Sequence, residues 1–296
     1  MNTPASPASQ RARRVILFFV ALALMALLWE AYKAVGPPQG GNVLGVRILP
    51  KAENSSMPHI WDMLRRYGRA EQRGRSGSIL VSVVSGAWFT MRIALAGLLL
   101  GVIVGMGLAI VMARFKVVER GLSPWLVISQ TVPLIALAPL VVSWGGRLHA
   151  GSFTWQKWMS AAVIAAFLAF FPIAIGGLKG LTSPPPEAVE LMDSYAAPWK
   201  ASLIKMRLPA SLPYLVPALK LGANAAVVGS IVAELSTGLR GGIGRLILEY
   251  MRESTGDPAK VFTAVFGAAG LGLAMAGLIG LLDSMVSRHR PKEFAA

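Results

Sequence analysis

Residues 182–217 read TSPPPEAVELMDSYAAPWKASLIKMRLPASLPYLVP, a polar segment with several prolines that separates two long apolar runs. These runs cover Met159–Leu181 and Leu212–Leu235, and each is long enough to cross a bilayer as a helix, which takes about 20 residues. The insert therefore predicts a short helix at the membrane surface between two spans. Four apolar residues of the insert fall on one face of that helix at i, i+3, i+4 and i+7, namely Ala188, Leu191, Met192 and Tyr195.

The start of this helix carries capping signals. Ser183 can cap it, with Pro184–Pro186 in the first turn and Glu187 near the positive end of the helix dipole. Its apolar face fits two settings, which the pattern alone leaves equal. It can lie in a groove on a partner protein, or it can lie in the headgroup region of the bilayer.

Composition identifies the chain as a membrane protein. Of 296 residues, 54% are hydrophobic and only 15% are charged, with a mean hydropathy of +0.58, whereas soluble domains carry about 25% charged residues. The net charge of +15 resides in loops between apolar runs, which favours contact with membrane lipids over nucleic acid.

The apolar runs predict an all-α membrane protein with about six transmembrane helices and the short helix between spans four and five. Arg92 would cost about 2.5–3.5 kcal/mol at the bilayer centre, so the second span should start near Ile93, with residues 79–92 as an interfacial lead-in. The expected spans are Val15–Val35, Ile93–Phe115, Pro124–Trp144, Met159–Leu181, Leu212–Leu235 and Val261–Val286.

Six spans place both termini on one side of the membrane. Lys and Arg are nearly balanced between alternate loops and do not set the orientation, but the basic cluster at 11–14 favours a cytoplasmic N-terminus. The expected division is a tail at 1–14, a first helix at 15–35, an extracytoplasmic loop at 36–78, a core domain at 79–290 with a loop at 182–211, and a C-terminal tail at 291–296.

The insert resembles the EAA loop of permease subunits of binding-protein-dependent ABC importers, a cytoplasmic loop that carries a coupling helix. That pattern is Glu-Ala-Ala, three residues, Gly, nine residues, then Ile-x-Leu-Pro. The spacing is kept here, while Leu191 and Met192 replace the alanines, Ala196 the glycine and Met206 the isoleucine. The resemblance implies that the ATPase-coupling residues are Glu187, Glu190, Leu191, Met192, Tyr195, Ala196, Leu208 and Pro209. Lys200, Lys205 and Arg207 are expected to flank the docking groove or to meet anionic lipid, and the pattern favours lipid.

A second resemblance lies in residues 129–146, SQTVPLIALAPLVVSWGG. Its two prolines should break or kink the span, which a membrane tolerates where protein or a water-filled cavity satisfies the freed carbonyls. The segment is similar to the third span of permeases from the nitrate, sulfonate and taurine branch, which lines the translocation pathway, although a kinked structural helix fits as well. FFPI at 170–173 and GGIGRLI at 241–247 resemble the same branch in matching order.

Polar groups inside predicted spans are further candidates for the pathway. Two such groups are Asn224 and Glu234. Each also has a simpler explanation, because Asn224 could make a structural hydrogen bond and Glu234 could reach the membrane interface. A stripe of Gly97, Gly101 and Gly105 should let helices approach closely, within the chain or between two chains. The candidate pathway residues are Gln130, Thr131, Pro133, Pro139, Asn224 and Glu234.

The resemblance implies a bacterial plasma-membrane (inner-membrane) multi-pass permease that works with two ATPase subunits, an extracytoplasmic solute-binding protein and a second permease, identical or homologous. The sequence has no Gly-x4-Gly-Lys-Ser/Thr loop and no cysteine, so we expect no enzymatic activity, metal or cofactor. The implied substrate is a small anion such as a sulfonate, taurine or nitrate, or a pyrimidine-type vitamin precursor. The alternatives are an ion-gradient-driven secondary transporter and a scaffold subunit of a membrane complex.

Overall fold

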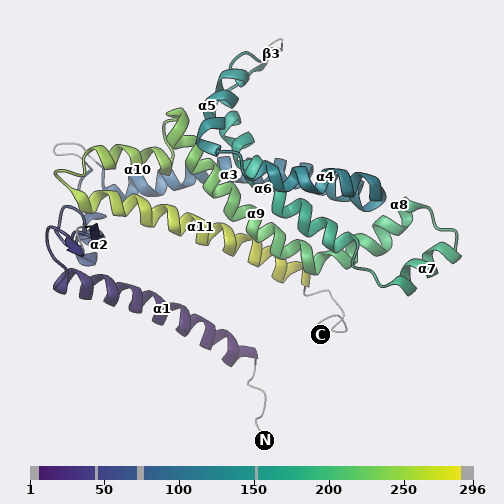
Figure 1. Cartoon of the computed structure of the whole chain (residues 1–296), viewed down its shortest axis with the longest axis horizontal. Coiled ribbons are helices and arrows are strands. Elements are labelled where there is room, and N and C mark those ends of the chain that lie inside the picture. The colour runs from purple at the N-terminus through teal and green to yellow at the C-terminus, as the bar shows by residue number, and fades with distance from the viewer. Residues whose placement is uncertain (1–6, 44–45, 72–76, 151–152, 288–296) are drawn as a thin grey trace, which may run out of the picture. The chain divides into compact units, whose positions relative to one another are not determined.

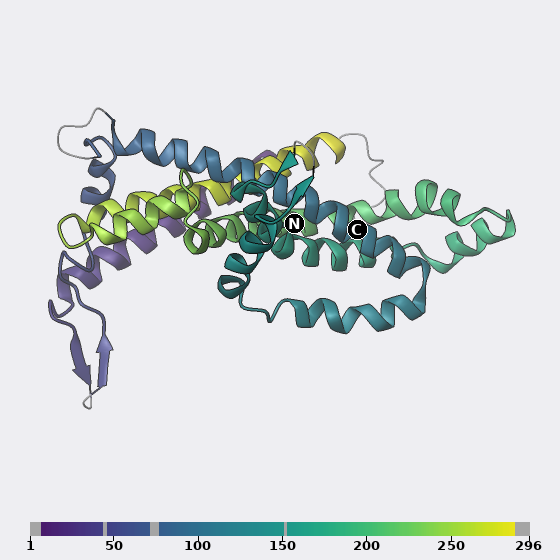
Figure 2. The same ribbon diagram turned by 90° about the horizontal axis from the view of Figure 1, so that it is seen from above.

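The computed structural model describes residues 7–43, 46–71, 77–150 and 153–287, and its regular structure is almost entirely helical (Figures 1 and 2). Two short antiparallel hairpins, β1–β2 and β3–β4, are the exceptions in this part of the chain. The predicted all-α class is therefore confirmed. The elements are α1 Pro7–Val35, β1 Gly41–Val43, β2 Val46–Leu49, α2 Ile60–Arg66, α3 Ile79–Arg114, α4 Lys116–Ser129, α5 Leu134–Gly145, β3 His149–Ala150, β4 Phe153–Thr154, α6 Lys157–Leu181, α7 Pro186–Ser194, α8 Trp199–Ser202, the π-helical turn η1 Leu203–Arg207, α9 Leu208–Thr237, α10 Ile243–Arg252 and α11 Pro258–Ser287.

The predicted number of spans is also confirmed. Five of the described helices are long and apolar enough to cross a membrane, and α4 with α5 adds a sixth if this bent pair is one span. The chain divides into two compact units, residues 1–80 with 249–263 (unit 1) and residues 81–248 with 264–296 (unit 2). The predicted domain boundaries remain predictions, and the tail expected at 291–296 and the first six residues lie outside the described part.

The helix α3 is a single run of 36 residues. At 1.5 Å per residue it is about 54 Å long, against a hydrocarbon core of about 30 Å. Part of α3 must therefore extend beyond the hydrocarbon. This agrees with the expected lead-in at 79–92, which the structure builds as the first turns of the same helix.

The third predicted span is broken. Its two halves, α4 and α5, meet at an angle of 101°, and Pro133 stands at the break with extended backbone angles before the first turn of α5. Pro139 lies inside α5, so the break falls at the first of the two prolines. The preceding residue, Val132, cannot easily continue a helix, because a following proline disfavours the helical region.

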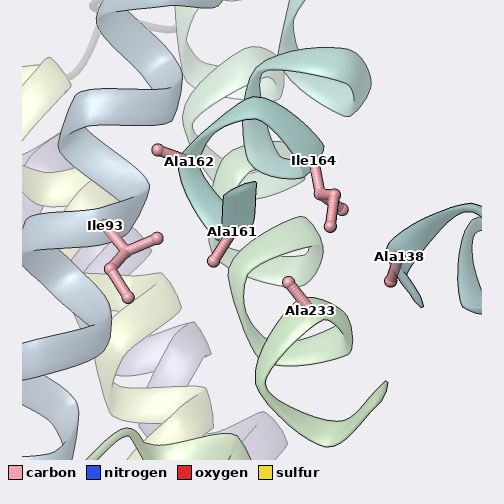
Figure 3. Close-up of a cluster of buried hydrophobic side chains, with 6 residues drawn as sticks. All are labelled: Ile93, Ala138, Ala161, Ala162, Ile164 and Ala233. Carbon is pink, nitrogen blue, oxygen red and sulfur yellow. The ribbon is translucent and has the colours of Figure 1, made fainter. Parts of the chain in front are cut away.

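The core of unit 2 is built from small residues that let helices approach closely. A Cβ atom placed on Gly229 of α9 would lie 2.8 Å from the Cα atom of Ala165 on α6, well inside van der Waals contact. On α3, the glycine stripe faces α6 in the same way, since a Cβ on Gly101 would lie 2.8 Å from Ala169 Cβ. The expected close packing within the chain is therefore confirmed. Figure 3 shows one buried cluster, with Ile93 from α3, Ala138 from α5, Ala161, Ala162 and Ile164 from α6, and Ala233 from α9.

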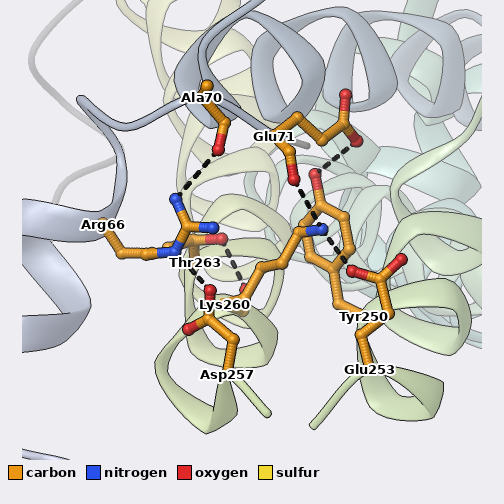
Figure 4. A network of polar contacts seen from close by, with 8 residues as sticks. All are labelled: Arg66, Ala70, Glu71, Tyr250, Glu253, Asp257, Lys260 and Thr263. Carbon is orange, nitrogen blue, oxygen red and sulfur yellow. Dashed lines mark hydrogen bonds and ion pairs between the residues drawn. The ribbon is translucent and has the colours of Figure 1, made fainter. Parts of the chain in front are cut away.

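Unit 1 is held by polar contacts around a buried lysine (Figure 4). Lys260 is only 2% exposed, and its ammonium group donates to the carbonyl of Glu71 at 3.0 Å and to the carboxylate of Glu253 at 2.5 Å. The same ammonium lies 4.4 Å from the centre of the Tyr250 ring, and the Tyr250 hydroxyl donates to the Glu71 carboxylate. A buried charge needs such partners, because leaving it unpaired away from water is costly. The network therefore connects Glu71 to residues 250–260, which are far from it in the sequence.

Candidate coupling loop and pathway residues

The predicted surface helix is present as α7, between α6 and α9. Both views show it at the tip of a loop that extends beyond the ends of these two helices (Figures 1 and 2). Its start differs from the prediction, because Ser183 does not cap it. The Ser183 hydroxyl donates to the Gly180 carbonyl, at the end of α6. Each proline in the run disfavours a helical residue before it, so Pro185 stays extended and α7 begins at Pro186.

The end of α7 forms a Schellman motif. The N–H of Ala196 donates to the Asp193 carbonyl at 2.9 Å, and that of Ala197 donates to the Met192 carbonyl at 3.0 Å. This pattern requires a left-handed residue at Ala196, whose φ is +49°. Glycine adopts that conformation without steric cost, which gives a physical reason for glycine at this position of the EAA pattern. Ala196 adopts the same left-handed conformation at a steric cost.

The base of the loop is fixed to the ends of α3 and α6. The Arg207 guanidinium donates to the Leu181 carbonyl at 2.9 Å and lies 4.8 Å from the centre of the Trp199 ring. Arg114 approaches the same ring, at 5.0 Å. The Arg207 side chain thus has partners inside the protein, and its expected contact with anionic lipid stays a prediction. Nothing in the sequence pattern singles out Trp199, because its two cationic neighbours come from other elements.

The motif residues after α7 belong to this base. Leu208 is the first residue of α9 and packs with Trp199 and Leu203 against a buried cluster of Ala109, Ala113 and Leu181. Pro209 comes next, shortly after the π-helical turn η1, in a helical run that continues from Trp199 to Thr237. Leu208 therefore anchors the helix that leaves the loop to the ends of α3 and α6.

In contrast to its base, the tip of the loop is open. None of the residues of α7 is buried, and Leu191 is 56% and Tyr195 77% exposed. Tyr195 lies one residue beyond the last residue of α7, as its C-cap, and so extends the predicted stripe into the turn. Glu187 and Glu190 are exposed on the same helix. The structure thus exposes Leu191, Tyr195 and the two acids at the surface, while Ala188 and Met192 are half-buried.

The pathway candidates around the broken span lie together. Gln130 caps the end of α4, and Thr131 and Pro133 are exposed in the break. The Thr131 hydroxyl donates to the Ile128 carbonyl, which satisfies a backbone acceptor near the end of α4. Pro139, six residues after Pro133, is exposed on α5. The break therefore places polar and exposed groups where a continuous apolar helix would otherwise stand.

The two candidates on α9 differ. Asn224 is exposed midway along the helix, on the same face as Leu221 and Val228, which are 63% and 54% exposed. Glu234 is 0% exposed, and its carboxylate accepts hydrogen bonds from the Thr90 hydroxyl at 2.7 Å and from the N–H of Gly244 at 2.8 Å. The structure does not bring these two side chains together. Their roles in a pathway remain predictions.

A bundle of membrane-spanning helices with one proline-broken span and an amphipathic helix displayed on a fixed base has the architecture of a transport permease. The family model described as "Binding-protein-dependent transport system inner membrane component" matches residues 97–288. The chain belongs to this family.

Several curated proteins are similar in sequence. The formylaminopyrimidine transport permease protein ThiX of Halalkalibacterium halodurans is 31% identical over 204 residues, which are 69% of this chain and 77% of that protein. The putative aliphatic sulfonates transport permease protein SsuC of Bacillus subtilis is 28% identical over 67% of each chain. The nitrate import permease protein NrtB of Synechococcus elongatus is 23% identical over 91% of this chain and 89% of that protein.

Among solved structures, a chain of the inward-facing MetNI methionine ABC transporter has the same fold. The TM-score is 0.58 at 20% sequence identity, and the match covers 71% of this chain and 96% of that chain.

Proposed function

We propose that this chain is the permease subunit of an ABC importer, which forms the translocation pathway and couples it to ATP hydrolysis on a separate ATPase subunit. The observation that carries the proposal is the contrast within the loop at 182–211. Its base is tied to α3 and α6 through Arg207 and Trp199, while its tip, α7, has no buried residue. A firmly held helix with an open apolar face is suited to transmit a push from a docked partner.

The complex would contain two copies of this permease, or this permease and a homologue, with one ATPase subunit docked on each coupling loop. A solute-binding protein would deliver the solute from the other side. The family description, which names a binding-protein-dependent transport system, supports the presence of a solute-binding protein. No residue of this chain needs to take part in ATP chemistry, and the protein works as a mechanical coupler without a catalytic site or cofactor of its own.

The orientation follows from the same assignment. The ATPase works in the cytoplasm, so the loop at 182–211 faces inward, and the N-terminus and C-terminus are cytoplasmic when the bent pair counts as one span. The loop at 36–78 is then extracytoplasmic. The family description as an inner membrane component supports the bacterial plasma membrane as the location.

The pathway would run past the break between α4 and α5 and the exposed face of α9. Gln130, Thr131 and Asn224 offer neutral hydrogen-bonding groups, which suit a solute that must pass without tight binding. The relatives transport a formylaminopyrimidine, aliphatic sulfonates and nitrate according to their names. A small anion or a pyrimidine-type vitamin precursor is therefore the proposed substrate class.

Removal of the apolar docking face tests the proposal. Leu191→Asp should lower the affinity for the ATPase subunit about 10- to 100-fold, because burial of a leucine contributes about 1.5–3 kcal/mol. Leu191→Met keeps the face apolar at similar volume and serves as the matched control. The tagged chain is purified from native membranes in mild detergent, and co-purifying proteins are identified by mass spectrometry.

An ATPase with a Gly-x4-Gly-Lys-Ser/Thr sequence should be retained by the wild type and by Leu191→Met and lost by Leu191→Asp. If the wild-type chain is recovered alone, the proposal is wrong and a secondary transporter becomes the better assignment. Recovery with unrelated membrane subunits would instead favour a scaffold role. Equal recovery of the ATPase with Leu191→Asp would place the docking surface elsewhere.

A further inference from the structure

The carboxylate of Glu234 is completely buried near the end of α9, yet it is not an isolated charge. One oxygen lies 2.7 Å from the Thr90 hydroxyl on α3, and the other accepts the N–H of Gly244 at 2.8 Å. Thr90 also accepts the N–H of Ile243 at 2.9 Å. Ile243 and Gly244 are the first two residues of α10. The carboxylate of one residue on α9 thus connects three helices, because it accepts hydrogen bonds from a backbone N–H of α10 and from a hydroxyl of α3.

The physical chemistry of the first turn of α10 explains why an acid stands here. The first N–H groups of a helix have no partner within the helix, and its N-terminal end attracts negative charge. Burial without partners would cost several kcal/mol for each of these groups. Glu234 and Thr90 satisfy the N–H groups of Gly244 and Ile243 at once, so the carboxylate and the helix start stabilise each other.

The connection between α9 and α10 is shaped to fit this contact. A Cβ atom on Gly242 would clash with the Glu234 carboxylate, and one on Gly244 would lie 2.7 Å from the Ile231 carbonyl and 2.9 Å from a Glu234 oxygen. Gly238 ends α9 with φ +65°, and Gly241 has φ +101°, conformations that favour glycine. Four glycines therefore allow the chain to reverse direction and bring the first turn of α10 onto the acid.

A control group on the same helix has none of these features. Ser230 stands one turn before Glu234 and is also 0% exposed. Its hydroxyl donates to the Ala226 carbonyl of its own helix at 2.8 Å. Burial of a polar side chain on α9 does not by itself create a contact between helices.

We propose that Glu234 is a positioning residue for transport: its carboxylate fastens the first turn of α10 to α9 and α3, so that a displacement of α9 is carried to α10. The inference rests on the proposed function, because the displacement would start at the coupling loop. The helix α9 begins at Leu208, in the base of that loop, and ends at Thr237. Both α9 and α3, which carries Arg114 at the base and Thr90 beside the acid, reach from the docking base to the buried carboxylate.

Hydrogen exchange on the complex with its co-purified ATPase tests the inference. The complex is placed in lipid nanodiscs and compared without nucleotide and after trapping with ATP and vanadate. Two segments are followed by mass spectrometry, the loop at 182–211 and the start of α10 at 239–248. In the wild type, trapping should change exchange in both segments.

In Glu234→Ala the response at the loop should remain, while the trapping-dependent change at 239–248 is lost. The amide of Gly244 should exchange about 10-fold faster, because it loses its buried acceptor. Ser230→Ala should behave as the wild type. Glu234→Gln keeps an acceptor oxygen and should restore the trapping-dependent change, a rescue that loss of folded protein would not show.

If Glu234→Ala yields no folded complex, Thr90→Val and Thr90→Ser decide the matter. Valine keeps the shape of the side chain and removes the hydroxyl, and it should weaken the response at 239–248, whereas serine should keep it. An unchanged response in Glu234→Ala or in Thr90→Val, or a wild type whose α10 does not respond to trapping, overturns the inference. A chain that captures no ATPase would instead refute the proposed function.

Discussion

The left-handed alanine at the end of α7 leads to a quantitative prediction: Ala196→Gly should stabilise the coupling loop. An L-residue in the left-handed region costs about 1–2 kcal/mol, and Ala196 is there with φ +49°. Glycine avoids this strain but loses about 0.5–1 kcal/mol more conformational freedom on folding. The net gain should be about 0.5–1 kcal/mol, since the hydrogen bonds of the Schellman motif come from backbone atoms that the substitution leaves in place.

Amide hydrogen exchange measures this gain locally. The N–H groups of Ala196 and Ala197 donate to Asp193 and Met192, and they exchange only when the turn opens. A gain of about 0.5–1 kcal/mol should slow their exchange about two- to fivefold in Ala196→Gly. The experiment uses the complex in detergent, with peptides that cover residues 186–200.

Ala188→Gly makes the same chemical change inside α7, where the backbone is helical, and supplies the control. There glycine should destabilise the helix by about 1 kcal/mol and speed exchange in the same peptides. Opposite signs for the same substitution inside α7 and two residues beyond its end would show that the backbone conformation at residue 196 is the cause. Exchange in Ala196→Gly that is as fast as in the wild type, or faster, would refute the reasoning.

Two further substitutions probe the packing of each unit, each with a matched control. Gly229→Ala should lower the thermal stability of the purified protein, because the new Cβ would lie 2.8 Å from Ala165 Cα and overpacking costs about 1–3 kcal/mol. Gly277→Ala is the control. A Cβ on Gly277 would have nothing within 4 Å, so this variant should leave the thermal stability unchanged or raise it. Lys260→Ala should destabilise unit 1 by about 1–3 kcal/mol through unpaired polar groups, seen as faster exchange in residues 60–71 and 249–263, whereas Arg252→Ala on the exposed surface should shift stability by less than about 0.5 kcal/mol. An equal effect of the two glycine variants, or of the two cation variants, would contradict the packing described here.

The spans and the coupling helix could be predicted from the sequence, because both depend on local properties. A run of about 20 apolar residues is sufficient to identify a span, and a proline fixes its own backbone angle and limits the residue before it. This rule allows a break at Pro133 or at Pro139 and does not choose between them, since α5 continues through Pro139. The same rule, applied to all three prolines at 184–186, places the start of α7 at Pro186 and excludes Ser183 as its cap.

Contacts between distant residues could not be predicted in this way. Arg207 looks like any basic residue at a membrane surface until the ends of α3 and α6 bring Arg114 and the Leu181 carbonyl to the same place. Glu234 looks like an acid near the end of a span, and its partner Thr90 lies on the first helix of the core. In both cases the periodicity of one segment gives the face of a helix, but the identity of the neighbour depends on how the helices pack.

The distribution of prolines and small residues along α9 suggests how the two ends of this helix work together. Its first third contains Pro209, Pro213 and Pro217 and follows the π-helical turn η1. Each of the two interior prolines removes a helical hydrogen bond, so this part can change direction at lower cost. The remainder has no proline, and its buried glycines and alanines pack closely against α6. A displacement at the coupling loop should therefore bend α9 near its start, while the stiff remainder moves with α6 as one body and carries Glu234, with the first turn of α10, along with it.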